Sequence, residues 1–289
     1  DLQSHIMTLN PSTPLELSTA LTWSGNNGFI NFNQDLTLSN TQTVIGNVTF
    51  EGNGNTLNFD PSGAIVVAPS SQLTLKDMNI TNIDSASIYC TDNTGSIVLD
   101  NVRWIQSDDY EFAQGALVFS DAVLMSGQNK VFTYSSTQTS TILANSTVTL
   151  DNLFTFSYAP SNNSTTLLEF TDFTSALSLR HIQFYIIPGL ELTKGQLSFS
   201  QAPTIYALGE GLTLGDRISA SNDMQLLSSD SSSFTLAEGK LDYKNLDIDS
   251  VQLWNPNTLS FASTTTLQLY ENLYIKSGRA DFHPEATYL

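Results

Sequence analysis

A short phrase of alternating apolar and polar residues, broken by a polar corner, recurs along the chain. In residues 96–104 the alternation runs to Leu99, is interrupted by Asp100 and Asn101, and resumes to Trp104. Alternation with a period of two predicts a short strand with one buried face. Further copies of the phrase are residues 73–80, 148–156 and 177–184. A unit of two strands joined by a corner, repeated at intervals of roughly 22 to 26 residues, predicts a β-solenoid.

The composition agrees with stacked strands. Of the 289 residues, 40% are hydrophobic, which is enough for a substantial core, and only 13% are charged. The usual charged fraction is about a quarter, so Ser, Thr, Asn and Gln must supply most of the polar surface. Hydroxyl and amide side chains can form ladders between neighbouring strands.

The charge balance argues against two classes of partner. Ten Lys and Arg against 28 Asp and Glu give a formal net charge of −18. Nucleic acid and anionic membrane surfaces would be repelled, so neither is expected to bind. The chain holds no run of about 18 apolar residues, so we expect no membrane insertion. Cys90 is the single cysteine, which excludes an internal disulfide.

The chain divides into three segments. Residues 1–12 are expected to be a leader or tag-derived segment, 13–276 the solenoid, and 277–289 a C-terminal tail. Within the second segment, Thr13 can cap a helix, Pro14 suits its first turn, and Leu17 and Leu21 share one face. These residues predict a short helix that covers the N-terminal end of the solenoid.

After this predicted helix, apolar residues alternate in 28–32, 36–38 and 50–57, and the last stretch contains Gly52-Asn53-Gly54. The pattern resembles the N-terminal coils of the right-handed parallel β-helix (pectin-lyase-like) superfamily, which includes pectate lyases, polygalacturonases, autotransporter passenger domains, surface adhesins and phage tailspikes. The resemblance covers roughly residues 13–275 and is closest in character to the autotransporter and adhesin types. It implies an all-β, single-stranded right-handed parallel β-helix of about ten to twelve coils, on the order of 50 Å long.

His181 is the first candidate for chemistry, because the chain has only three histidines and this one follows Arg180. Aligning copies of the repeated phrase places His181 at the corner position held by Asp77, Asn101 and Asn152. Asn, Asp and His are enriched in the left-handed backbone conformation that such corners require. We therefore predict that His181 is a structural corner residue.

Asp108, Asp109 and Glu111 form the best carboxylate cluster. Paired carboxylates can act as acid and base in glycoside hydrolysis or bind calcium, and such a cluster can equally be a solvated loop. Polygalacturonases carry Asn-Thr-Asp, Asp-Asp, Gly-His-Gly and Arg-Ile-Lys motifs. Here only the Asp-Asp pair matches in type and approximate spacing.

The other motifs of these enzymes are altered or missing. Asn93-Thr94 is preceded by Asp92 and followed by Gly95, and Arg217-Ile218 is followed by Ser219. No Gly-His-Gly occurs, and neither Arg103 nor Arg180 lies in the Arg-x-x-Pro-x-x-Arg pattern of pectate lyases. We therefore assign no catalytic residue, no metal ligand and no cofactor.

Aromatic residues have two roles to consider. Most phenylalanines fall at strand positions, which predicts stacked aromatics inside the coils: Phe32, Phe50, Phe59, Phe156, Phe170, Phe184 and Phe199. Tyr110, Tyr185 and Trp254 are the aromatic residues whose exposure would allow stacking on a sugar. Cys90 ends a strand and is predicted to be a small buried apolar residue.

Two functions remain open. The first is a non-enzymatic, secreted or surface-exposed β-helix that serves as a rigid adhesion-type scaffold, with glycans or a cell-surface protein as partners and a monomeric state favoured. The alternative is a carbohydrate-active β-helix: a polysaccharide lyase, a hydrolase or a tailspike-like depolymerase. The alternative requires Asp92, Asp108 and Asp109 to converge in a groove beside an exposed aromatic side chain.

Overall fold

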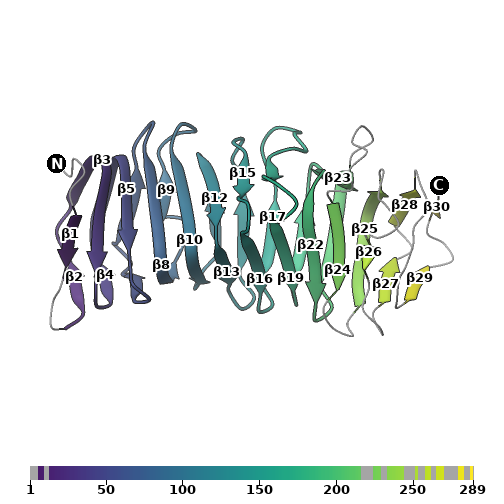
Figure 1. The fold of residues 1–289 in the computed structure, drawn as a ribbon, viewed down its shortest axis with the longest axis horizontal. Coiled ribbons are helices and arrows are strands. Elements are labelled where there is room, and N and C mark those ends of the chain that lie inside the picture. The colour runs from purple at the N-terminus through teal and green to yellow at the C-terminus, as the bar shows by residue number, and fades with distance from the viewer. Residues whose placement is uncertain are drawn as a thin grey trace.

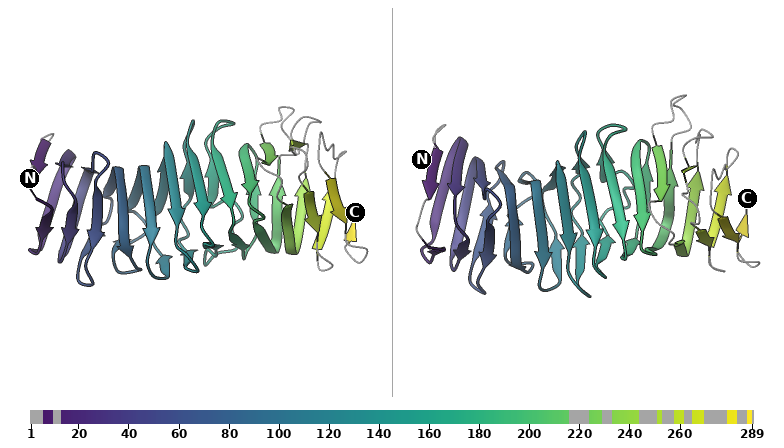
Figure 2. Two further views of the ribbon diagram at one scale, coloured as in Figure 1. Left: turned by 90° about the horizontal axis from the view of Figure 1, so that it is seen from below. Right: turned by 60° about the horizontal axis from the view of Figure 1, so that its bottom comes forward.

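The computed structural model describes residues 6–9 and 13–215 and, beyond them, the backbone of strands within 224–288, with side chains there only for residues 235–241. The fold is an all-β, right-handed parallel solenoid of about nine turns over residues 13–215, and paired strands continue beyond it. Figure 1 shows a rod whose strands cross its long axis, with the N-terminus at one end and the C-terminus at the other. The views in Figure 2 show the coils following one another in regular steps.

The strands are short and numerous. Up to residue 215 they are β1 (Ile6–Leu9), β2 (Leu15–Leu17), β3 (Leu21–Phe32), β4 (Leu36–Leu38), β5 (Thr41–Glu51), β6 (Thr56–Phe59), β7 (Ala64–Val67), β8 (Gln72–Ile83), β9 (Ile88–Cys90), β10 (Ser96–Gln106), β11 (Tyr110–Phe112), β12 (Ala116–Ser120), β13 (Ala122–Ser126), β14 (Val131–Tyr134), β15 (Ser140–Ile142), β16 (Thr147–Asp151), β17 (Thr155–Tyr158), β18 (Leu168–Phe170), β19 (Ala176–Arg180), β20 (Gln183–Ile186), β21 (Leu190–Leu192), β22 (Gly195–Ser200) and β23 (Thr204–Leu214). The later strands are β24 (Met224–Ser228), β25 (Ser233–Tyr243), β26 (Val251–Gln252), β27 (Thr258–Phe261), β28 (Thr265–Leu269), β29 (Arg279–Phe282) and β30 (Thr287–Tyr288).

Strand pairing gives each turn three faces. On the first face, the N-terminal halves of β8 and β10 stack with β12, which aligns Leu75, Leu99 and Phe119. On the second face, the C-terminal half of β10 stacks with β13 and β16, which aligns Trp104 with Met125 and Leu150. The long strands β8 and β10 therefore cross a corner and contribute to two faces.

The third face consists of β11, β14, β17, β20 and the N-terminal half of β23. Its inward side chains form an aromatic stack inside the rod. Tyr110 lies on Phe132 with ring centroids 5.1 Å apart, and Phe132 lies on Phe156 at the same separation. Aromatic side chains at matching positions on successive strands favour such stacking, because parallel strands in register repeat about every 4.8 Å.

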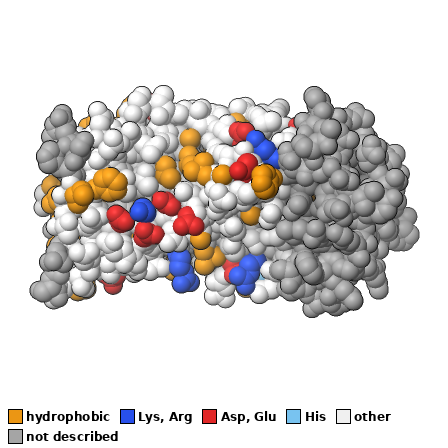
Figure 3. Space-filling model, viewed as in Figure 1, with side chains coloured by type: hydrophobic (Ala, Val, Ile, Leu, Met, Phe, Trp, Pro, Cys, Tyr) orange, Lys and Arg blue, Asp and Glu red, His pale blue; other side chains and the backbone are white. Residues whose placement is uncertain are grey.

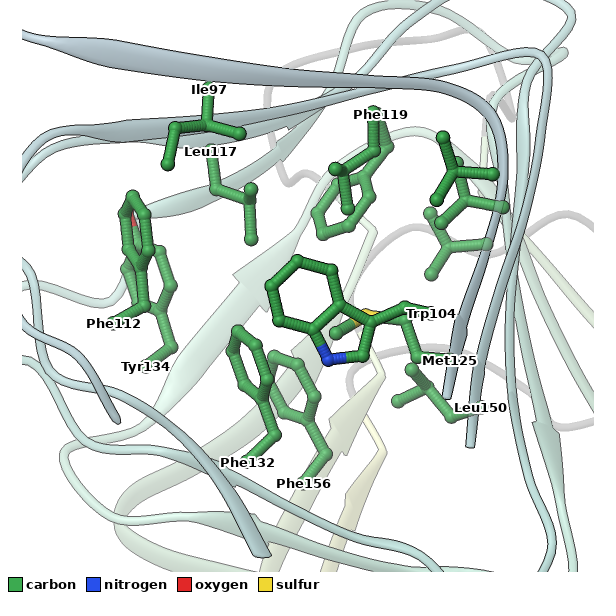
Figure 4. Close-up of a cluster of buried hydrophobic side chains, with 14 of the residues drawn as sticks. Ile97, Trp104, Phe112, Leu117, Phe119, Met125, Phe132, Tyr134, Leu150 and Phe156 are labelled. Carbon is green, nitrogen blue, oxygen red and sulfur yellow. The ribbon is translucent and has the colours of Figure 1, made fainter. Parts of the chain in front are cut away.

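The predicted core is confirmed. Leu99 is fully buried, and the phenylalanines expected inside the coils are buried as well. Figure 4 shows the Trp104 indole in the middle of the coil, with Phe119 on one side and Phe132 on the other. The Trp104 and Phe132 rings meet edge to face at 6.1 Å. In the described part of the chain, alternate side chains from three faces fill the rod, and no helix is present.

The predicted N-terminal helix is wrong. Residues 15–17 form β2, which pairs with β4, and residues 21–32 form β3, which pairs with β5. Leu15 and Leu17 both pack against the core, as alternating strand residues should, whereas the helical face would have required Leu21, which is exposed. Strand pairing with the next coil overrides the local helix signals of Thr13 and Pro14.

Pairing also extends into both flanking segments. Strand β1, within the segment expected to be a leader, pairs with β3, and β29 and β30, within the expected tail, pair with β27 and β28. In the described part of the chain, no helix is long and apolar enough to cross a membrane.

Candidate functional site

An open groove of about 430 Å³ lies along the corner between the second and third faces. We call it the corner groove. Its lining comes from four successive coils: Asn129, Leu153, Thr155, His181, Ile182, Gln183, Ala202 and Thr204. Because Val131, Thr155, Gln183 and Thr204 are in register, Asn129, Leu153, His181 and Ala202 form one column of corner residues. The groove therefore runs along the rod, crossing about 14 Å at about 4.8 Å per coil.

The column of corner residues has an unusual backbone. Asn129, Leu153, His181 and Ala202 all have positive φ, between 49° and 56°. Asn and His tolerate this left-handed conformation, while Leu and Ala seldom adopt it. The Leu153 N–H donates to the His181 carbonyl at 2.9 Å, so backbone bonding between coils holds the corner in place. These four corner residues are exposed at the groove, whereas Ile182 of its lining is buried in the core.

Two outward tyrosines on the third face adjoin the groove. Tyr185 of β20 and Tyr206 of β23 are in register, and their rings stack with centroids 4.2 Å apart and an interplanar angle of 1°. We call them the tyrosine pair. The Tyr185 hydroxyl donates to Gln183 Oε1 at 3.5 Å, and Gln183 lines the groove. Partial burial raises the pKa of Tyr185, as do Tyr206 and Glu238.

The residue on the other side of Tyr185 is small. Ser157 of β17 is in register with Tyr185, and Thr133 of β14 is in register with Ser157. In the described part of the chain, the ring contact found for Tyr185 is with Tyr206 alone. A serine side chain is too short to cover an aromatic ring, so the face of Tyr185 directed toward Ser157 is open.

His181 is a corner residue, as predicted, with φ of 49°. It shares its corner with Asn152, because Leu150 and Leu179 are in register and each lies two residues earlier. The prediction that Asp77 and Asn101 hold the same corner is wrong. Those two residues lie between the first and second faces, since β16 stacks on β13, which stacks on the C-terminal half of β10.

The carboxylate cluster bonds to the turns of its own and the next coil. Asp108 accepts from the Asp109 N–H at 2.9 Å and from Lys130 Nζ at 3.3 Å. Asp109 accepts from the Val131 N–H at 2.9 Å. The Asp109 N–H and the Lys130 charge lower the pKa of Asp108, which opposes a role as a general acid.

Glu111 and Asp92 are also engaged in turns. Glu111 accepts from the Ser135 hydroxyl at 2.6 Å, and Asp92 accepts from the Thr94 hydroxyl at 2.7 Å and from its N–H at 2.8 Å. Both bonds from Thr94 lower the pKa of Asp92. Asp92 follows β9, whereas Asp108 precedes β11 of the next coil, so the two carboxylates lie at opposite ends of their strands. The structure does not bring them together.

The remaining predicted residues divide into buried and surface positions. Tyr110 is buried and donates to the Ile88 carbonyl, so it offers no surface for stacking. Cys90 is buried as predicted, and burial, with a smaller effect of Asp92, raises its pKa to about 12. Arg180 pairs with Asp151 at 3.6 Å. Trp254 and Arg217 lie outside the described residues.

An acidic cluster on the rod carries no metal site. Figure 3 shows acidic side chains gathered around a basic one on the face in view. Lys76 pairs with Glu51 at 3.1 Å and with Asp77 at 3.6 Å, and Asp100 lies close enough to influence it. Over the described residues, no group of three or more His, Cys, Asp or Glu side chains has an arrangement that could hold a metal ion.

The sequence reasoning identified Tyr185 but missed Tyr206, Ser157 and most of the groove. A signal was present: Gln183-x-Tyr185 and Thr204-x-Tyr206 place the same kinds of outward residue 21 positions apart, which is close to one coil. Finding it required the coil register, which the structure supplies.

No protein-family model, no curated protein and no solved structure matches this chain. The parallel β-helix architecture is therefore established from the strand pairing itself.

Proposed function

We propose that the chain is a non-enzymatic β-solenoid, secreted or exposed at a cell surface, that serves as a rigid scaffold for adhesion to glycans. The observation that carries this proposal is the use of the carboxylates. Asp92, Asp108, Asp109 and Glu111 each accept hydrogen bonds within a turn or from the next coil. Carboxylates used in this way stabilise the corners and are poorly suited to proton transfer.

The coil architecture supports a scaffold role. Each coil contacts its neighbours through backbone pairing and a continuous core, which makes the rod stiff along its length. The formal charge of −18 also disfavours polyanionic partners. A rod of this kind presents repeated outward side chains at fixed spacing, which suits contact with an extended partner.

The test combines binding and turnover on one preparation of the protein. A glycan array measures binding, and a reducing-end assay with polygalacturonate, pectin and xylan measures cleavage. We expect glycan binding without release of reducing ends. Release of reducing ends or of unsaturated products would contradict the proposal and favour the polysaccharide lyase, hydrolase or depolymerase function.

A further inference from the structure

We propose that the open face of Tyr185, together with the adjoining corner groove, binds an uncharged oligosaccharide. The inference rests on the proposed adhesion function and assigns the site and the class of sugar. It starts from the tyrosine pair, because these two partly exposed rings stack on each other outside the core.

The geometry of the pair leaves one ring face for a ligand. The strands of the third face are stacked along the rod, and the two tyrosine rings are parallel. One face of Tyr185 is covered by Tyr206, and the other is directed toward Ser157, which is too small to cover it. The C–H face of a sugar ring can pack against this open face, as apolar groups do against aromatic rings.

The polar lining of the groove matches sugar hydroxyl groups. Asn129, Thr155, His181, Gln183 and Thr204 are amide, hydroxyl or imidazole side chains. Each can donate and accept hydrogen bonds, as a sugar hydroxyl does, whereas a fixed charge cannot do both. Leu153 adds an exposed apolar surface. Gln183 joins the two parts, since it lines the groove and accepts from the Tyr185 hydroxyl.

The charges near the site favour a neutral ligand. Glu238 is in register with Tyr206 on the next strand, and Glu111 lies in the same outward column at β11. Arg180 precedes His181 but is paired with Asp151. With a formal net charge of −18, the protein would repel an acidic polysaccharide. The groove crosses four coils, so its length suits an oligosaccharide better than a single sugar.

The test is calorimetric titration with cellohexaose, xylohexaose, mannohexaose and N-acetylchitohexaose, with trigalacturonate as the charged comparison. We expect at least one uncharged sugar to bind and trigalacturonate not to bind. Tyr185→Ala should weaken binding about tenfold, from the loss of a stacking contact. Tyr89→Ala is the control, because Tyr89 is an exposed tyrosine of β9, which pairs with β7, and it does not line the corner groove. It should bind as the wild type does.

A second variant keeps the fold and closes the site. Ser157→Ile would place a branched aliphatic side chain against the open face of Tyr185 without offering a new aromatic face toward Thr133, so it should abolish binding without lowering the melting temperature. The inference is overturned if none of the four uncharged sugars binds, if only trigalacturonate binds, or if Tyr185→Ala or Ser157→Ile binds as tightly as the wild type. If the protein binds a sugar and the variants bind it equally well, this site is wrong but the proposed scaffold function stands. If reducing ends are released, the scaffold function itself is contradicted.

Discussion

Asn101 Nδ2 donates a 2.7 Å hydrogen bond to Oδ1 of Asp77, which occupies the same corner one coil earlier. Both residues have left-handed backbones, with φ of 53° and 50°. One side-chain type therefore serves two purposes at this corner: it tolerates the backbone conformation, and it links neighbouring coils.

Replacement of Asn101 separates these two purposes. Asn101→Gly loses the hydrogen bond and should cost about 1 kcal/mol. Asn101→Ala also loses the hydrogen bond, and it should lower the free energy of unfolding by a further ~1–2 kcal/mol, because alanine disfavours the left-handed backbone conformation. Urea unfolding followed by circular dichroism measures both. Equal free energies of unfolding for the two variants would show that the backbone conformation contributes nothing.

Leu99 and Val98 test the inward and outward assignment. Leu99 is fully buried on the first face, so Leu99→Asp places a carboxylate in the core and should destabilise the fold by several kcal/mol (about 4). Val98 is the matched control, since it is the adjacent, partly exposed residue of β10. Val98→Asp should cost about 1 kcal/mol or less. Thermal melts that rank the two variants in the opposite order would refute the assignment.

Substitutions at Gly46 and Gly54 distinguish the cost of backbone strain from the cost of a steric clash between coils. Both have positive φ, of 80° and 85°. A Cβ at Gly46 would lie 2.4 Å from the Gly25 carbonyl oxygen, whereas a Cβ at Gly54 would meet no atom within 4 Å. Gly54→Ala should therefore cost only about 1–2 kcal/mol of backbone strain, and Gly46→Ala clearly more. Similar melting temperatures for the two variants would contradict the close approach of coils at Gly46.

Asp100 gives the rod a pH-dependent weakness. Partial burial raises its pKa, and Asp77 and Asp121 add to this against the opposing effects of Ser120 and Lys76. An acid whose folded-state pKa is raised lowers stability once it ionises. Asp100→Asn should therefore raise the melting temperature at pH 7, and the gain should disappear as the pH falls below the unfolded-state value of about 3.9. If the variant were less stable than the wild type at pH 7 and equally stable at pH 3, ionised Asp100 would stabilise the fold, which would contradict this prediction.

Much of the architecture was predictable from local alternation. The phrase around Leu99 gives the strands, the inward residues and the left-handed corners, because a period of two is read directly from the sequence. The assignment of corners was not predictable. Residues 96–104 and 148–156 look alike, yet β10 spans two faces and β16 lies on one. The face on which such a segment lies depends on the strands that pair with it, and this pairing is set by the whole rod and not by the local sequence.

The site was harder to predict than the fold for the same reason. Tyr185 stands out as an aromatic residue between the buried Phe184 and Ile186, but its partner Tyr206 and the small Ser157 belong to other coils. An open ring face depends on both neighbours. The helix expected at residues 13–23 failed because β2 and β3 gain more from pairing with β4 and β5 than local capping could offer.

A crystal structure of the protein soaked with the tightest-binding of the four uncharged hexasaccharides tests the central claim most directly, since it shows the coil register and the ligand together. We predict a sugar ring against Tyr185 above Ser157, further sugar units along the corner groove, and the carboxylates of Asp92 and Asp108 still bonded within their turns. A sugar held between Asp108 and Asp109, or coils in which Tyr185 and Tyr206 do not adjoin, would contradict it.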